Sequence, residues 1–256
     1  MQFRYIYGPV SSWRLGRSLG IDLLSWKSKV CNFNCVYCQL GPAAALTTRP
    51  KVLVKTSEVI AELKKLPKIK IDYITFSGRG EPCLARNLGE AIKAVKKMNI
   101  APVAVLTNAS LLNQAKIRKN LSLADFVIVK LDSCSQDMLE RINRPEKGVR
   151  FKKIIQGIKK FQQGFKGKFA LQMMFLKKNL DSAEKLAQLA RVVNPDEVQI
   201  NTPTRPSAEK SLSKNEIARI KSYFKGLNFI SVYDIQPKKV ASLSNKQTLR
   251  RRGKVI

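Results

Sequence analysis

Apolar residues along the chain follow two alternating patterns. Short apolar runs bounded by glycine or polar residues predict buried strands, whereas apolar residues spaced three and four apart predict one face of a helix. The predicted strands cover 18–24, 71–78, 103–108, 126–132, 169–176 and 197–201. The predicted helices cover 57–66, 88–98, 111–121, 135–142, 151–161, 182–193 and 213–224.

Local signals mark several of the helix ends. Pro67 follows the first helix, and Ser135 is placed to cap the short helix through Ile142. Ser213 and Glu216 have the spacing of a capping box, and Gly226 closes the same helix.

Six strand and helix units in alternation predict an α/β fold with a parallel sheet and right-handed crossovers. Apolar strands such as 126–131 suit a sheet that is covered by helices. Residues 1–227 are predicted to form the main domain, and residues 228–256 a C-terminal strand and basic tail.

Polar residues follow most of the predicted strands. Because ligands of such folds gather where the strands end, this edge of the sheet is the predicted site. The residues at these strand ends are the three cysteines of 31–38, Ser77 to Glu81, Thr107 and Asn108, Lys130 and Asp132, and Asn201 to Arg205.

The segment CNFNCVYC places Cys31, Cys35 and Cys38 in a CxxxCxxC pattern. Three thiolates on one loop can hold three corners of an iron–sulfur cube and leave the fourth iron open. Structural zinc is an alternative, but it needs a fourth ligand, for which the chain offers only the distant Cys83 or Cys134. Three free core thiols are another, although polar neighbours argue against it. A disulfide framework fits poorly with five cysteines in 256 residues.

The chain has 48 Lys and Arg against 18 Asp and Glu, a formal net charge of +30. Such a charge favours polyanionic partners, and RNA is the leading hypothesis. Residues 141–169 hold ten basic side chains and one acid, and 236–256 hold seven basic side chains and no acid. The alternative is that these lysines only solvate helix surfaces.

Composition and the apolar pattern also restrict the expected cellular compartment and the possible kinds of active site. No apolar run approaches the roughly 18 residues of a membrane span, and 1–10 does not read as a signal peptide, so we expect a cytoplasmic protein without a membrane partner. The absence of histidine excludes Ser-His-Asp hydrolases, Cys-His proteases and histidine-ligated metal sites.

The cysteine motif, together with SGRGEP at 77–82, resembles the radical S-adenosylmethionine (SAM) superfamily. The words YGPVSSWRLGRSLGIDLL, NCVYCQLG, LTNASLL, ERINRP and QINTPTRP are similar to those of the small proteins grouped with the tRNA wyosine-base synthase. That synthase carries a second cluster on N-terminal cysteines, whereas no cysteine precedes Cys31 here.

This resemblance implies a partial (β/α)6 barrel and a radical SAM enzyme. It implies a 4Fe-4S cluster on Cys31, Cys35 and Cys38, with SAM on the open iron, reductive cleavage of SAM to a 5'-deoxyadenosyl radical, and a reductant such as flavodoxin or ferredoxin. Tyr37 matches the aromatic position beside the adenine. Gly78, Gly80 and Glu81 match the strand end that holds the SAM amino group. Asn108 and Asp132 are further candidates for SAM contacts, with an Asx turn and a helix N-cap as their structural alternatives.

Three function hypotheses remain open. The first is RNA modification by a radical SAM enzyme, and the second is the same chemistry on a protein or peptide. The third is a nucleic-acid-binding module with a structural metal. Cys83 is open to three interpretations, a fourth ligand, a radical relay or a packing thiol, of which the packing thiol is favoured, and Cys134 is interpreted in the same way.

Overall fold

In the computed structural model, which describes residues 3–236 and 238–252, eight strands form one sheet whose spatial order follows the sequence. Strands β2 to β8 run parallel, and β1 pairs antiparallel with β2 as an N-terminal hairpin. The strands are β1 (Ile6–Ser12), β2 (Gly16–Ile21), β3 (Tyr73–Phe76), β4 (Val103–Thr107), β5 (Phe126–Lys130), β6 (Lys168–Met174), β7 (Glu197–Asn201) and β8 (Phe229–Ser231).

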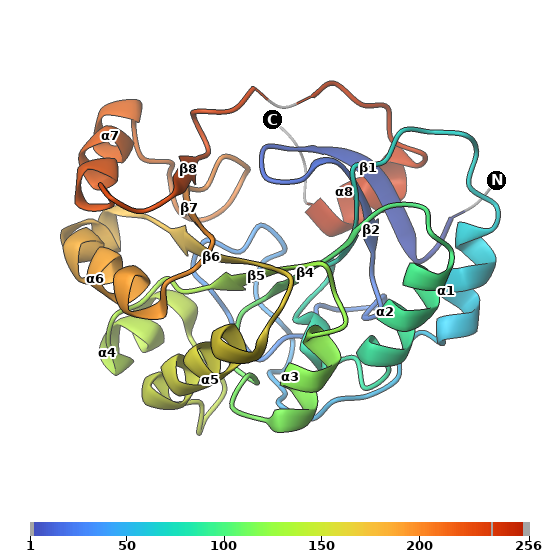
Figure 1. Cartoon of the computed structure of the whole chain (residues 1–256), viewed down its shortest axis with the longest axis horizontal. Coiled ribbons are helices and arrows are strands. Elements are labelled where there is room, and N and C mark those ends of the chain that lie inside the picture. Colours follow the sequence, from blue (N-terminus) through green and yellow to red (C-terminus); the bar gives the residue numbers. More distant parts are fainter. Residues whose placement is uncertain (1–2, 237, 253–256) are drawn as a thin grey trace.

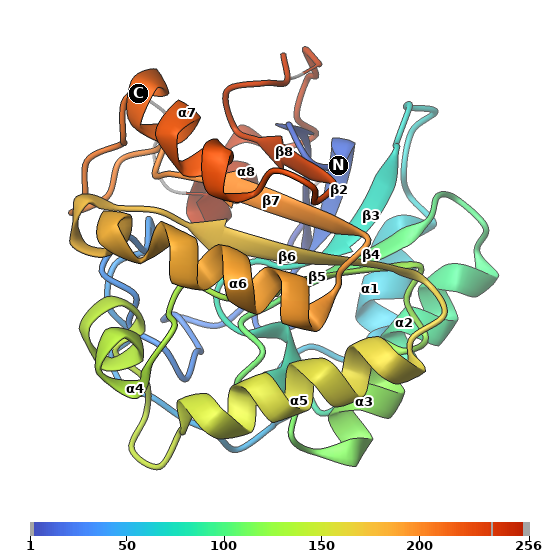
Figure 2. The same cartoon turned by 60° about the vertical axis from the view of Figure 1, so that its left-hand side comes forward.

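Helices α1 to α7 follow the curved sheet along its outer side (Figures 1 and 2). Together with α8 they are α1 (Thr56–Leu63), α2 (Leu88–Lys97), α3 (Ala115–Leu121), α4 (Gln136–Met138), α5 (Phe151–Gly164), α6 (Ala183–Val193), α7 (Lys214–Tyr223) and α8 (Asn245–Arg252). Shorter helical turns are η1 (Pro82–Leu84), the π-helix η2 (Leu139–Asn143) and η3 (Lys177–Ser182). The predicted α/β partial barrel is therefore confirmed.

Successive side chains of each strand point to opposite faces of the sheet, so the sheet separates two apolar regions. Val127 and Val129 of β5 point into the main core beneath the helices, whereas Phe126 and Ile128 belong to a small cluster on the inner side of the sheet. Above this inner cluster, toward the carboxyl ends of the strands, Lys130 and Gln172 are polar. The fold thus leaves a polar cavity at the strand ends.

The elements differ from the sequence prediction in several places, among them helix α8, which forms within the predicted basic tail. The helix predicted from Leu111 begins at Ala115, because Leu111 and Leu112 are already buried from the turn before it. The helix that Ser135 caps continues as the π-helix η2. Strand β1 was not predicted, and it adds an antiparallel strand to the expected parallel sheet.

The C-terminal segment packs along the N-terminal hairpin. The Leu243 amide donates to the Gly8 carbonyl at 2.6 Å, and α8 contacts β1 (Figure 1). This cover hides part of the free edge of β1 from other chains. Of the basic residues in 236–256, Lys254 lies outside the described residues.

No helix in the described ranges combines the length and the apolar character that a bilayer crossing requires.

Candidate active site

The three predicted cysteines lie on one wall of the cavity. After β2 the chain crosses the strand ends and brings Cys31, Cys35 and Cys38 onto two adjoining hollows of about 280 and 300 Å³. Gly78 and Gly80, which follow β3, line both hollows as well. Two segments that are separated by some forty residues of sequence thus form one site.

Close backbone contact at Gly80 fixes the cysteine loop to the end of β3. The Val30 amide donates to the Arg79 carbonyl at 2.9 Å, and the Glu81 amide donates to the Val30 carbonyl at 3.1 Å. A Cβ atom at Gly80 would lie 1.6 Å from the Val30 carbonyl oxygen, and one at Gly78 would lie 2.5 Å from Cγ of Asp22. Both positions therefore require glycine for steric reasons.

Replacing Gly80 with alanine should separate these two segments. We expect the variant to lose about 1–3 kcal/mol of unfolding free energy, as overpacking does, and to bind less iron on reconstitution. Urea unfolding and iron analysis measure the two effects. Gly164→Ala is the matched control, because no atom lies within 4 Å of its Cβ position. Equal stability of the two variants would contradict the steric role of Gly80.

Each cysteine sulfur has a nitrogen donor nearby. Lys29 Nζ lies 3.6 Å from Cys38 Sγ, Asn143 Nδ2 lies 3.4 Å from Cys35 Sγ, and Asn108 Nδ2 lies 3.9 Å from Cys31 Sγ. Lys29 is buried and also donates to the Gly41 carbonyl at 2.7 Å. Such donors stabilise sulfur that carries negative charge.

Burial opposes free thiolates at this wall. It raises the pKa of Cys31 to about 12, with Cys35 and Glu81 adding electrostatic repulsion, and it also raises the pKa of Cys35. Deprotonation of these thiols therefore depends on a bound cationic centre.

The residue types at this wall fit an iron–sulfur cluster, and its binding stays a prediction. Within residues 3–236 and 238–252, no three Cys, Asp or Glu side chains converge so that they could hold one metal ion. An iron–sulfur cube takes one thiolate at each of three separate irons, and Cys31, Cys35 and Cys38 line the same cavity.

Glu81 and Asn108 lie next to the cysteine loop. Glu81 is buried, and its two carboxylate oxygens accept from the Thr107 hydroxyl at 2.7 Å, the Cys83 amide at 3.0 Å and the Asn108 amide at 2.6 Å. These bonds join the ends of β3 and β4. The Asn108 side chain donates to Asn32 Oδ1 at 2.8 Å and accepts from the Ser110 amide at 3.1 Å, so it forms an Asx turn that also holds the loop. Contacts of Glu81 and Asn108 with SAM stay predictions.

Tyr37 and Asp132 form a second support for the loop. The Tyr37 hydroxyl donates to Asp132 in a short hydrogen bond, and Asn143 donates to the same carboxylate oxygen at 2.9 Å. The other oxygen of Asp132 accepts from the Met174 amide at 2.8 Å. The ring of Tyr37 lines both hollows, whereas Asp132 lies behind it. Asp132 therefore orients Tyr37, and a direct SAM contact of either residue stays a prediction.

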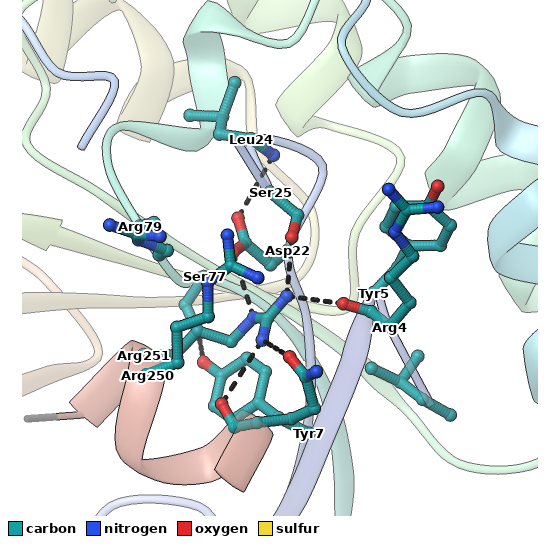
Figure 3. A network of polar contacts seen from close by, with 12 residues as sticks. Arg4, Tyr5, Tyr7, Asp22, Leu24, Ser25, Ser77, Arg79, Arg250 and Arg251 are labelled. Atoms are coloured by element: carbon teal, nitrogen blue, oxygen red, sulfur yellow. Dashed lines mark hydrogen bonds and ion pairs between the residues drawn. The ribbon is translucent and has the colours of Figure 1, made fainter. Parts of the chain in front are cut away.

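The C-terminal helix contributes to the opposite wall. Arg251 is buried, with its Nε 3.0 Å from Asp22 Oδ2 and its Nη2 2.7 Å from both the Arg4 carbonyl and the Ser25 hydroxyl (Figure 3). Its guanidinium also lies 5.5 Å from the centre of the Tyr7 ring. This network holds the last turn of α8 in place, and Arg251 and Arg252 line the hollow of about 280 Å³.

Sequence reasoning did not select several residues of this site. Lys29 lies two residues before Cys31 but was not selected, Arg14 is an isolated arginine, and Arg252 was selected only as part of the basic segment 236–256; folding brings Arg14 and Arg252 to the cavity. Asn143 lies in the word ERINRP, which contributed to the family resemblance, and in a π-helix, a conformation frequent at functional sites.

Comparison with known proteins assigns a family. The profile described as the radical SAM superfamily matches residues 27–190. A UPF0026 protein of Synechocystis sp. is 46% identical over 205 residues, which are 80% of this chain and 77% of that protein. A protein named GTPase Obg of Brachyspira hyodysenteriae is 39% identical over 88% of this chain but only 34% of its own length. A probable GTP 3',8-cyclase of Saccharolobus solfataricus is 25% identical over 73% of this chain and 58% of that protein.

Solved structures share the fold at low sequence identity. SuiB of Streptococcus suis bound to S-adenosylmethionine superposes with a TM-score of 0.62 and 16% identity, over 80% of this chain and 48% of SuiB. The native protein anSMEcpe with bound AdoMet has a TM-score of 0.59 and 18% identity, over 80% of this chain and 62% of anSMEcpe. This chain thus spans about half to two thirds of these structures.

Proposed function

The chain belongs to the radical SAM superfamily and to the UPF0026 proteins, and on this premise we propose that it uses a cysteine-ligated 4Fe-4S cluster to cleave SAM reductively and modify RNA. Membership of the radical SAM superfamily supports an enzymatic function. The observation that carries the cofactor assignment is that three cysteines and the glycine segment after β3 line the same cavity. The words that resemble the group around the tRNA wyosine-base synthase suggest RNA as the substrate, and that resemblance stays a prediction.

Cys31, Cys35 and Cys38 would hold the cluster, while Tyr37, Gly78 and Gly80 would face SAM. A bound cluster and SAM would supply an electron and a 5'-deoxyadenosyl radical that abstracts hydrogen from the substrate. A reductant such as flavodoxin or ferredoxin would be the electron donor.

The residues of the chain itself would position these groups and limit access of water. Asn143 and Lys29 donate toward the cysteine sulfurs, and the Asp132 carboxylate holds the Tyr37 ring at the wall. Gly80 lets the cysteine loop and the β3 end meet at backbone distance. A cavity of this kind shields a reactive species from bulk solvent.

Charge supports RNA as the substrate. The formal net charge is +30, and α5 buries Ile154, Ile158 and Phe161 while it exposes Lys152 and Lys160. Because α5 lies in the outer helical layer, its lysines would contact parts of an RNA outside the cavity (Figure 2).

A free nucleotide is the second candidate substrate. Similarity to probable GTP 3',8-cyclases, at 25% identity over 187 residues, favours it. Both candidates are phosphate-bearing nucleotides, and they differ in whether the nucleotide is part of a polymer.

Anaerobic reconstitution tests the proposed reaction. We expect about four irons and four sulfides per chain, and we expect 5'-deoxyadenosine after addition of SAM and a chemical reductant. Chromatography with mass detection measures this product. A preparation that holds one zinc per chain and forms no 5'-deoxyadenosine would instead support a nucleic-acid-binding module with a structural metal.

The RNA proposal predicts strong salt dependence of binding. With roughly 6 to 10 phosphate contacts, affinity for tRNA should fall by about 10³ to 10⁵ between about 50 and 200 mM salt. Filter binding or fluorescence anisotropy at several salt concentrations measures the slope. A flat profile would contradict binding through phosphates.

A further inference from the structure

The cavity carries positive charge that no acid in its lining balances. Arg14, Arg205 and Arg252 line the hollow of about 280 Å³, and none of them forms an ion pair with a carboxylate of the described residues. Glu81 is the one carboxylate in that lining, and its oxygens accept from protein donors. The arginines therefore line the cavity without a paired Asp or Glu side chain among the described residues.

Two buried donors in the same lining also lack acceptors. Gln172 is only 4% exposed, and its Oε1 accepts from Lys130 Nζ at 3.2 Å, but its Nε2 has no partner. The buried Nε of Arg14 has no partner either. Buried donors are normally paired, so these two could pair with a ligand only after neighbouring side chains move to expose them.

Electrostatics agrees with this geometry. Burial is the main cause that lowers the pKa of Arg14 to about 10, and the charge of Arg252 adds to it. Two guanidinium groups close enough to disfavour each other would both be stabilised by an anion between them.

Three different elements present these arginines. Arg14 lies between β1 and β2, Arg205 follows β7, and Arg252 ends α8. Arg252 is held there by its neighbour Arg251, whose bonds to Asp22, Ser25 and Arg4 fix the last turn of the helix (Figure 3). Arg205 donates to Gln39 Oε1 at 3.0 Å, just beyond the last cysteine. The positive groups are thus built into the site from several sides.

We propose that this arginine face, Arg14, Arg205 and Arg252, binds the phosphate of a nucleotide substrate, either free or within RNA. The proposal rests on the proposed function and deepens it. A phosphate offers oxygens in several directions, as donors from three elements require, whereas a carboxylate offers two in one plane. Phe33, Leu106 and Ile128 supply apolar surface for a base in the same hollow.

Binding by the reconstituted, unreduced full chain tests the site without turnover. The probes are the four ribonucleoside 5'-monophosphates, their nucleosides and a short single-stranded RNA, titrated by calorimetry or anisotropy. We expect at least one monophosphate, or the RNA, to bind about ten-fold or more tightly than the matching nucleosides, and Arg252→Gln and Arg14→Gln to remove that preference.

Arg250→Gln is the matched control, because it removes the same charge from the same turn of α8 but its side chain is exposed and does not line the cavity. Equal losses in Arg250→Gln and Arg252→Gln would overturn the proposal, as would nucleosides that bind as tightly as nucleotides. If circular dichroism shows that Arg14→Gln does not fold, the Arg252→Gln variant alone tests the proposal.

The two arms distinguish the source of the phosphate. Tight binding of monophosphates alone assigns a free nucleotide, and arginine-dependent binding of the RNA assigns a polymer. Wild-type protein that binds nucleotides through these arginines but forms no 5'-deoxyadenosine would overturn the proposed reaction and keep the site. Formation of 5'-deoxyadenosine without arginine-dependent binding would overturn the site alone.

Discussion

Replacing Cys35 with alanine is expected to reduce the formation of 5'-deoxyadenosine to below detection. Cys35 is the middle one of the three proposed ligands, and Asn143 Nδ2 lies 3.4 Å from its sulfur. With one thiolate removed, two irons of a cube would lack a protein ligand, and reconstitution should yield far less iron per chain. Mass detection of the product and iron analysis of the same sample measure both effects.

Cys83→Ala and Cys134→Ala are the matched controls for this experiment. Cys83 is buried in the main core and lies 3.4 Å from the Thr107 hydroxyl, which agrees with a packing thiol. Cys134 packs beside Met138 and Ile142. Both variants should keep the iron content and the product. Loss of product in Cys83→Ala with a folded chain, or its retention in Cys35→Ala, would contradict the ligand assignment.

Replacing Arg251 with methionine is expected to lower the unfolding free energy by about 3–5 kcal/mol. The side chains of Arg251 and Asp22 are both almost completely buried, with 3.0 Å between Nε and Oδ2. Removal of one partner leaves the other charge buried without compensation, which is the costly way to break such a pair. Urea unfolding followed by circular dichroism measures the difference.

Arg250→Met provides the control on the same helix, because Arg250 is exposed and, among the described residues, its one side-chain hydrogen bond is to the Trp26 carbonyl. Its effect should stay within about 0.5 kcal/mol. The double variant Asp22→Asn with Arg251→Met should lose less than the sum of the single changes Asp22→Asn and Arg251→Met, since neither charge then stays alone. Additive losses would contradict direct coupling between α8 and the end of β2.

The periodic elements of the fold could be predicted because their patterns are local. Strands β3 to β7 and helices α1, α2, α5, α6 and α7 carry continuous or striped apolar residues over their full length. The capping box of Ser213 and Glu216 forms as predicted, with the Glu216 amide 3.2 Å from the Ser213 hydroxyl. In these segments local preference and tertiary packing agree.

Strand β1 and helix α8 could not be predicted for two different reasons. β1 contains Gly8 and Pro9, which sequence rules associate with turns, and the strand is stabilised by pairing with β2 and by cover from the C-terminal segment. α8 has no apolar stripe, and its most buried long side chain is Arg251. Arginine is normally read as a surface residue, so the partner Asp22, more than two hundred residues away, is invisible to a local pattern.

The residues of the candidate site also fall into two groups, those that a local motif reveals and those that only the fold brings together. The cysteines form a local motif, so their spacing was sufficient to select them. The second layer, Asn143 and Asp132 around Tyr37, depends on contacts between residues roughly a hundred positions apart. For Asp132 the sequence indicated a strand end, but only the fold shows that its oxygens bond to Tyr37, Asn143 and Met174.

The two terminal strands of the sheet affect the size of the substrate that the cavity can take. Among the described residues β1 and β8 are the terminal strands, and no ladder joins one to the other, so the strands do not close into a tube, although residues 232–236 and 238–243 lead from β8 to β1. A tube would admit only compounds small enough to enter through its end. An open sheet limits only the size of the group that enters the cavity. A long polymer can therefore lie across the strand ends while one of its units enters.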